Sequence, residues 1–281
     1  MKLIECPRDA MQGIHEFIPT QTKADYLNQL LRVGFDTIDF GSFVSPNAIP
    51  QLKDTSEVLS KLELSKTKSK LLAIVANERG AEDACNFEEI DYLGYPFSIS
   101  ETFQQRNTNS SIDQSMGRVE AIQKLCQKHN KQMVTYISMG FGNPYGDPFH
   151  EDIVAQWIQK LAQFDLKFFA LSDTIGVSEP GIINRLFSTL IPEYPNLEIG
   201  AHLHTTPDTW KEKVDAAFKS GCKRFDGAIL GYGGCPMAAD DLTGNMATEN
   251  LISYFNEMSV NLEIDSQRFN ESKLTAGSVF L

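Results

Sequence analysis

The segment 198–204 carries two histidines separated by one residue, His202 and His204. The apolar residues before them predict a short β-strand, and in an extended chain residues two apart point to the same side. The two imidazoles would then converge on one point, and two neutral imidazoles at a strand end can hold a divalent metal ion. Surface or hydrogen-bonded histidines are the alternative, and this short pattern by itself favours that alternative.

Asp9 and Asn245 are candidate ligands for the same metal site. Asp9 with the two histidines would offer one anionic oxygen and two nitrogens, which suits Mn²⁺, Mg²⁺, Zn²⁺ or Fe²⁺. The lack of a thiolate in this set disfavours Zn²⁺. Asn245 could add a carbonyl oxygen and leave positions open for substrate oxygens. Taken alone, Asp9 is better explained by an ion pair with Arg8 or a turn cap, and Asn245 by a helix cap.

Arg8 and Cys235 have side chains that could act directly on a substrate. The guanidinium of Arg8 has a fixed fork of donors that could stabilise a developing oxyanion. An ion pair with Asp39 or Asp173 is the alternative, and both roles can hold together. Cys235 follows glycines that let a loop approach a ligand closely, and its thiol could act as a general acid or base. A passive thiol in a turn is an equal alternative.

The elements that must position these residues alternate between strand and helix. Eight strands are predicted, at 2–5, 36–40, 70–75, 90–98, 132–139, 167–171, 197–201 and 223–228, with helices that include 111–128, 180–190 and 207–220. The alternation predicts parallel strands, and eight of them favour a closed (β/α)8 TIM barrel that forms a single domain over residues 1–281. In such barrels the chemistry lies at the C-terminal ends of the strands. The candidate residues end or follow predicted strands, except Asn245, which begins the last predicted helix at 245–258.

The composition narrows the classes of partner and compartment. The chain has 281 residues, a formal charge of −12 and 42% hydrophobic residues, which is enough for a large core. So acidic a chain is unsuited to the phosphate backbone of nucleic acids, and no run is long and apolar enough to span a bilayer. Five widely spaced cysteines without a Cys-x-x-Cys pair, and an N-terminus without a signal peptide, indicate a reducing compartment. The cytoplasm is therefore expected.

The motifs, in their order along the chain, resemble those of the 3-hydroxy-3-methylglutaryl-CoA lyase family, one of the metal-dependent lyase and Claisen-condensing barrels. The resemblance covers nearly the whole chain. It rests on the runs 7–9 with Gln12, 42–46, 107–112, 172–177, 201–204, 231–236 and 244–249. The Gly-Gly-Cys-Pro run separates the lyases from the condensing synthases, and no residues remain for the C-terminal regulatory domain that such synthases often carry.

The resemblance implies a reaction and a role for each candidate residue. The reaction is the retro-Claisen cleavage of 3-hydroxy-3-methylglutaryl-CoA to acetyl-CoA and acetoacetate, by a homodimer that serves leucine breakdown. The implied ligands of a Mg²⁺ or Mn²⁺ ion are Asp9, His202, His204 and Asn245. The implied catalytic residues are Arg8, which binds substrate and stabilises the enolate, Cys235 in the catalytic loop, and the acidic residues Asp39 and Asp173. The general base stays open between His202 and Asp39.

Four features depart from the family pattern. Asp39 stands where the family usually has Glu, and a carboxylate displaced by one bond length can cost roughly 10²-fold in rate. Ala10 replaces a usual Gly, the run 205–208 replaces an Asp-Thr-Tyr-Gly type run, and the interval between Cys235 and Asn245 is one residue longer. Two alternative functions follow. One is a lyase of the same mechanism on another 3-hydroxyacyl-CoA, and the other is a barrel that binds metal or acyl-CoA without turnover.

Overall fold

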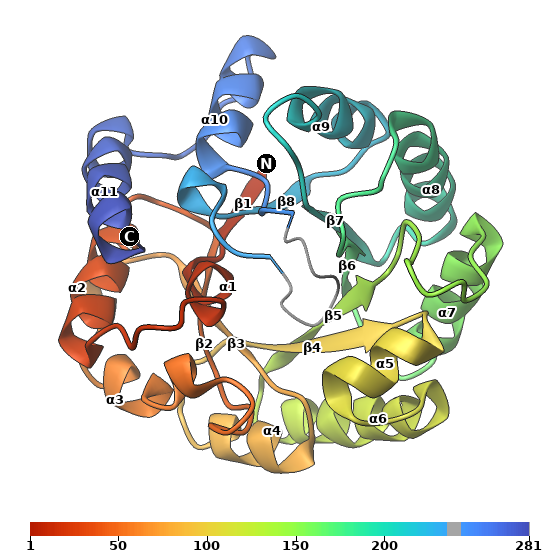
Figure 1. Ribbon diagram of the computed structural model, residues 1–281, viewed down its shortest axis with the longest axis horizontal. Coiled ribbons are helices and arrows are strands. Elements are labelled where there is room, and N and C mark those ends of the chain that lie inside the picture. Colours follow the sequence, from red (N-terminus) through yellow and green to blue (C-terminus); the bar gives the residue numbers. More distant parts are fainter. Residues whose placement is uncertain (235–242, 281) are drawn as a thin grey trace.

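Eight parallel strands close into a barrel, and helices cover its outside (Figure 1). The structure is a computed structural model that describes residues 1–234 and 243–280. The strands are β1 (Lys2–Glu5), β2 (Thr37–Ser42), β3 (Lys70–Ile74), β4 (Tyr92–Ser98), β5 (Gln132–Ser138), β6 (Phe168–Asp173), β7 (Glu198–Leu203) and β8 (Arg224–Gly227). Each strand pairs with the next along the chain, and β8 pairs with β1 to close the ring. The prediction of a (β/α)8 TIM barrel is confirmed.

Three strands run two residues further than the sequence pattern predicts. β2 ends at Ser42, β6 at Asp173 and β7 at Leu203. The strands continue because polar residues at these positions still pair with the neighbouring backbone, as Ser42 does with β3. Asp39 therefore lies inside β2 and His202 inside β7, which corrects the prediction that Asp39 ends its strand.

The helices that follow the strands include several that the sequence pattern did not reveal. The helices are α1 (Pro7–Gln12), α2 (Thr20–Leu30), α3 (Thr55–Leu59), α4 (Glu78–Cys85), α5 (Glu101–Thr108), α6 (Ile112–Lys128), α7 (Glu151–Ala162), α8 (Pro180–Glu193), α9 (Trp210–Lys219), α10 (Thr248–Glu257) and α11 (Ser266–Val279). Of these, α1, α4, α5 and α11 were not predicted. Proline at the first position suits the start of α1, because its missing N–H would be unpaired there anyway.

The start of α10 differs from the predicted start at residue 245. Residues 245–247 are extended instead, since Asn245 lies opposite His204 and Ala247 lies opposite Ala228 in isolated β-bridges. The amide of Met246 donates to the carbonyl of Leu203 at 2.9 Å. Asn245 is therefore not a helix cap but part of a short strand-like segment at the barrel mouth.

Two apolar layers hold the barrel together. The larger one lies between the strands and the surrounding helices, and the smaller one fills the barrel interior with Leu72, Ile74, Tyr92, Val134, Tyr136 and Ala170. Burial on both faces of the strands is what a parallel barrel requires. Within the described residues, no helix combines the length and the apolar character that crossing a bilayer would need.

Candidate active site

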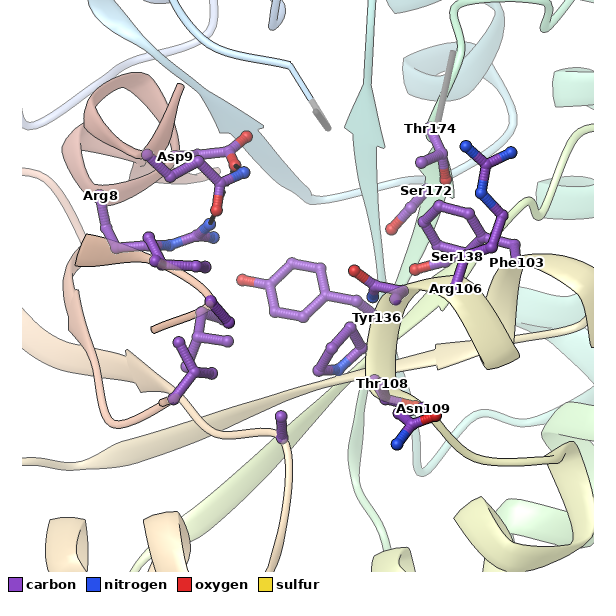
Figure 2. Close-up of a pocket in the computed structure, with 18 of the residues that line it drawn as sticks. Arg8, Asp9, Phe103, Arg106, Thr108, Asn109, Tyr136, Ser138, Ser172 and Thr174 are labelled. Atoms are coloured by element: carbon purple, nitrogen blue, oxygen red, sulfur yellow. Dashed lines mark hydrogen bonds and ion pairs between the residues drawn. The ribbon is translucent and has the colours of Figure 1, made fainter. Parts of the chain in front are cut away.

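A cavity of about 450 Å³ opens at the C-terminal end of the barrel. Arg8 and Asp9 from α1 lie on one side of it, Ser172 and Thr174 lie on the other, and the ring of Tyr136 projects between them (Figure 2). His202, His204 and the end of α5 also line the cavity. This is the end of the barrel where the sequence analysis expected the chemistry.

The structure brings Asp9, His202 and His204 together in this cavity. One ligand atom from each of the three lies within 4.8 Å of the others, and all three side chains are buried. The carboxylate of Asp9 comes from the first turn after β1, while the imidazoles come from β7 and the residue after it. The geometry thus joins residues that are almost two hundred positions apart in the sequence.

The protonation of His204 fits a role as a metal ligand. Burial, with the nearby charge of His202, lowers the pKa of His204 to about 4, so its imidazole is neutral near pH 7. Its Nδ1 atom is buried and has no hydrogen-bond partner among the described residues. A buried ring nitrogen without a partner is costly unless a ligand completes it. A divalent cation between these residues would do so.

Asp9 is held as a carboxylate by its surroundings. Burial alone would raise the pKa of Asp9, but the charges of Arg8, His202 and His204 lower it. Arg8 donates from Nη1 to Asp9 Oδ1 at 2.9 Å. The side-chain amide of Asn245 donates to Asp9 Oδ2 at 2.8 Å and to the carbonyl of Tyr232 at 2.9 Å. The ion pair that the sequence analysis weighed as an alternative for Asp9 is present, alongside the metal-type cluster.

Asp226 is a functional candidate that the sequence analysis missed. Its Oδ2 lies 3.2 Å from Nδ1 of His202, which leaves Nε2 of His202 facing Asp9 at 3.9 Å from Oδ2. Burial would lower the pKa of His202, but the hydrogen bond and the charge of Asp226 raise it. A carboxylate behind a metal-binding imidazole fixes its tautomer and its orientation. The sequence offers one signal for Asp226, an acidic residue inside the predicted strand 223–228, but it does not show that this residue pairs with His202.

A second group of possible ligands, Cys6, His202 and Asp226, lies below the first. Burial and the surrounding carboxylates raise the pKa of the Cys6 thiol well above its usual value, so it stays protonated and is a poor ligand. The Nη1 atom of Arg224 also lies 3.4 Å from Asp226 Oδ1. This fixed positive charge disfavours a cation there, so the group around Asp9 is the stronger site.

Arg8 connects the candidate metal group to Asp39. Its Nε and Nη2 atoms donate to Asp39 Oδ2 at 2.9 and 2.5 Å. Burial raises the pKa of Asp39 to about 6, although the charge of Arg8 lowers it in part. The other oxygen of Asp39, Oδ1, is buried without a hydrogen-bond partner among the described residues. Asp39 does not line the cavity itself, whereas Arg8 does.

Asp173 has a different environment from the other candidates. Its carboxylate accepts from Nζ of Lys213 at 2.8 Å and from the amide and hydroxyl of Ser178. Its neighbours Ser172 and Thr174 line the cavity, but Asp173 does not. The side chain of Asp173, the last residue of β6, therefore contacts α9 rather than the cavity. The sequence alternative of an ion pair with Arg8 is not what forms, because Asp39 and Asp9 occupy that guanidinium.

Cys235 lies outside the described residues, but the run that leads to it is described. Gly233 has a φ of +97°, and a Cβ atom there would lie 2.6 Å from Nδ2 of Asn245 and 2.8 Å from the backbone oxygen of Asp9. Only glycine can adopt this backbone conformation and approach so closely. The residues just before Cys235 therefore lie directly against the candidate metal group.

The fold and the site together define a class of protein. It is a (β/α)8 barrel with a carboxylate and two imidazoles grouped for a divalent cation, beside a cavity large enough for an organic substrate. A family model described as HMGL-like matches residues 3–274. The chain therefore belongs to the HMGL-like family, and the family that its motifs resemble is confirmed.

Known lyases are similar in sequence to this chain over nearly its whole length. Hydroxymethylglutaryl-CoA lyase YngG of Bacillus subtilis is 31% identical over 93% of this chain and 87% of its own length. The cytoplasmic 3-hydroxy-3-methylglutaryl-CoA lyase of Rattus norvegicus is 30% identical over 97% of this chain and 79% of its own. An HMG-CoA lyase from Acinetobacter baumannii, solved with coenzyme A and 3-methylmalate, superposes with a TM-score of 0.92 at 29% identity. That match covers 100% of this chain and 91% of the solved one.

Proposed function

We propose that the protein cleaves 3-hydroxy-3-methylglutaryl-CoA to acetyl-CoA and acetoacetate. The observation that carries this proposal is the grouping of Asp9, His202 and His204 next to Arg8 in the wall of the cavity. The family and the two similar lyases support the choice of reaction. A retro-Claisen cleavage needs a polarised hydroxyl, a base and a stabilised enolate, and these residues offer candidates for each need.

The metal that we propose is Mg²⁺ or Mn²⁺, held by Asp9, His202, His204 and Asn245. Such an ion supplies Lewis acidity that makes the tertiary hydroxyl of the substrate more acidic. Asn245 presents its amide nitrogen to Asp9 in the structure, so a carbonyl ligand requires the amide to turn over. Asp226 would keep His202 in the tautomer whose Nε2 is a ligand.

The remaining steps are proposed for side chains of this chain. A base removes the hydroxyl proton, and the carbon–carbon bond then breaks. His202 and Asp39 are the two candidates, and His202 could be the base only while its Nε2 is not a metal ligand, because its Nδ1 is bonded to Asp226. The electron pair moves toward the thioester, where Arg8 stabilises the enolate oxygen. Cys235 protonates the enolate carbon to give acetyl-CoA. Burial raises the pKa of Asp39 to about 6, closer to neutrality than an exposed carboxyl, as a base requires. Asp39 lies behind Arg8 and not on the cavity wall, so it would act as the base only after its carboxylate turns into the cavity.

The thioester's long arm would leave the cavity toward the end of α5. Arg106, Asn107, Thr108 and Asn109 line that side of the cavity. Among the lining residues, Arg8 is engaged by two carboxylates, whereas Arg106 stacks on the ring of Tyr145 and has no carboxylate within 4.0 Å in the described part of the chain. We propose Arg106 as the cation that meets the phosphates of coenzyme A, which an acidic chain otherwise repels.

Three predictions from the sequence accompany this proposal. The protein acts as a homodimer, it works in the cytoplasm, and residues 1–281 form one domain. The first can be checked by sedimentation velocity of the purified protein. The second can be checked by fractionation of cells that express it, and the third by limited proteolysis.

One assay tests the reaction. Purified protein is incubated with 3-hydroxy-3-methylglutaryl-CoA and Mg²⁺ or Mn²⁺, and acetoacetate is followed. We expect release that chelator abolishes and that Cys235→Ser and His202→Ala each abolish. Metal binding without any release would replace the proposal with a non-catalytic barrel. Release from a different 3-hydroxyacyl thioester alone would keep the mechanism and change the substrate.

A further inference from the structure

Lys213 is a buried cation that the proposed reaction does not use. It lies on α9, and only 2% of its surface is exposed. Its ammonium donates to Asp173 Oδ2 at 2.8 Å, to the carbonyl of Gly176 at 2.9 Å and to the carbonyl of His204 at 3.0 Å. An ammonium has three donors, and each one has a partner here.

Among the described residues, the carbonyl of His204 accepts no backbone hydrogen bond. His204 lies opposite Asn245 in an isolated antiparallel bridge, and the flanking hydrogen bonds run from Thr205 to Gly244 and from Met246 to Leu203. The carbonyl of His204 itself is turned away from that ladder, toward α9. Because His204 is only 2% exposed, removing Lys213 would leave this oxygen buried without a partner from residues 1–234 and 243–280.

The position of His204 therefore depends on Lys213 as well as on β7. Strand β7 ends at Leu203, so His204 is the first residue beyond its pairing with β6. Asp173, the last residue of β6, anchors the ammonium, and Ser178 holds that carboxylate in turn with bonds from its amide and its hydroxyl. One ammonium thus ties the ends of two neighbouring strands together directly behind a candidate metal ligand.

We propose that Lys213 is a positioning residue for the metal site, and that Asp173 acts through it rather than on the substrate. This inference rests on the proposed metal site. Lys213 fixes the backbone of His204 so that its imidazole meets Asp9 and His202. The ion pair with Lys213 explains why Asp173 is buried yet does not line the cavity.

The test compares Lys213→Met with a matched variant elsewhere in the barrel. Lys23 is likewise 2% exposed, is paired with Asp54 at 2.7 Å, and donates to the carbonyl of Gln51. Lys23→Met removes a similar buried ion pair whose partners include no candidate metal ligand. Mn²⁺ affinity is measured by the electron paramagnetic resonance signal of the free ion. We expect Lys213→Met to weaken binding about 10- to 100-fold, as loss of a residue behind a metal ligand does, and Lys23→Met to leave it unchanged.

A double variant separates positioning from charge compensation. Lys213→Met with Asp173→Asn leaves no buried carboxylate without a counter-ion, so it folds even if the single variant does not. We expect its Mn²⁺ affinity to stay low, and the amides of Thr205 and Met246 to exchange faster than wild type in the metal-free protein. Wild-type affinity in the double variant, or an equal loss in Lys23→Met, would overturn the inference. Wild-type protein that binds no Mn²⁺ would instead refute the proposed function.

Discussion

Glu5 is a buried carboxyl on the outer side of the barrel, and its protonation has a measurable consequence. Its Oε1 accepts from the amide of Ile229 at 2.9 Å, and its Oε2 lies 2.6 Å from the hydroxyl of Thr248. Glu5 therefore bridges the residues that precede and follow the loop after β8. Burial raises its pKa to about 8, so the group is largely neutral at pH 7 in the folded protein.

The sign of the pH effect follows from this raised pKa. In the unfolded chain Glu5 ionises near its ordinary value of 4.5, whereas in the folded protein it keeps its proton up to about pH 8. Its contribution to stability is complete below pH 4.5 and is lost as pH rises toward the folded pKa. Between these values the free energy of unfolding falls by about 1.4 kcal/mol per pH unit from this group alone.

Glu5→Gln removes this dependence and nearly keeps the shape. The glutamine oxygen can still accept from Ile229, and its amide can donate to the hydroxyl oxygen of Thr248. We expect the stability of Glu5→Gln relative to wild type to grow by roughly 3 to 4 kcal/mol between pH 5 and pH 8. Urea unfolding in chelator at several pH values measures the difference, and contributions from other groups cancel between the two proteins.

Thr248→Val is the companion variant. The hydroxyl of Thr248 lowers the pKa of Glu5, against the larger effect of burial. Removing this hydroxyl should therefore raise the pKa of Glu5 further. The free energy of unfolding should then keep falling with the same slope up to a higher pH. A difference between Glu5→Gln and wild type that does not change with pH would mean that Glu5 is already ionised when buried, and the reasoning would be wrong.

Three further variants test other parts of the site. Asp226→Asn keeps the shape but not the charge behind the metal-binding imidazole, and Mn²⁺ affinity should fall about 10- to 100-fold in a direct titration. Arg106→Ala should raise KM for the coenzyme A thioester about 3- to 10-fold, since an exposed ion pair is weak, without changing kcat; the same KM change with a pantetheine thioester would argue against a phosphate contact. Gly233→Ala should lower both Tm and Mn²⁺ affinity, because its Cβ would lie 2.6 Å from the amide of Asn245. Gly117→Ala, whose Cβ meets nothing within 4 Å, should lower neither.

The barrel could be predicted from the sequence because its strands are short apolar runs separated by amphipathic helices. The helix α11 was missed because it carries few apolar residues in a regular pattern, and Leu274 on it is 78% exposed. The helix α1 was missed since it is only six residues long and begins with charged residues after Pro7. Strand ends were the other error, because pairing with a neighbouring strand, rather than local sequence, decides where β2 and β6 stop.

The candidate site was predictable where residue type carried the signal. Two histidines at a strand end and an aspartate after β1 are visible in the sequence, and the structure groups them. The partners of Asp173 and His202 were not visible. Lys213 lies on a helix forty residues after Asp173, and Asp226 lies on the next strand, so only the folded chain brings each pair within hydrogen-bond distance.

The closed ring means that the candidate metal group cannot exist in any partly folded chain that lacks either end. Asp9 follows β1, which must pair with β8 across more than two hundred intervening residues, and the histidines lie on β7 and directly after it. The entropic cost of closing a loop grows only slowly with its length. The pairing of β1 with β8 nevertheless comes last during synthesis, because β8 is the last strand to be made. Capture of a divalent ion would therefore report that β8 has emerged and joined β1, which makes cation binding a direct signal for the final step of assembly.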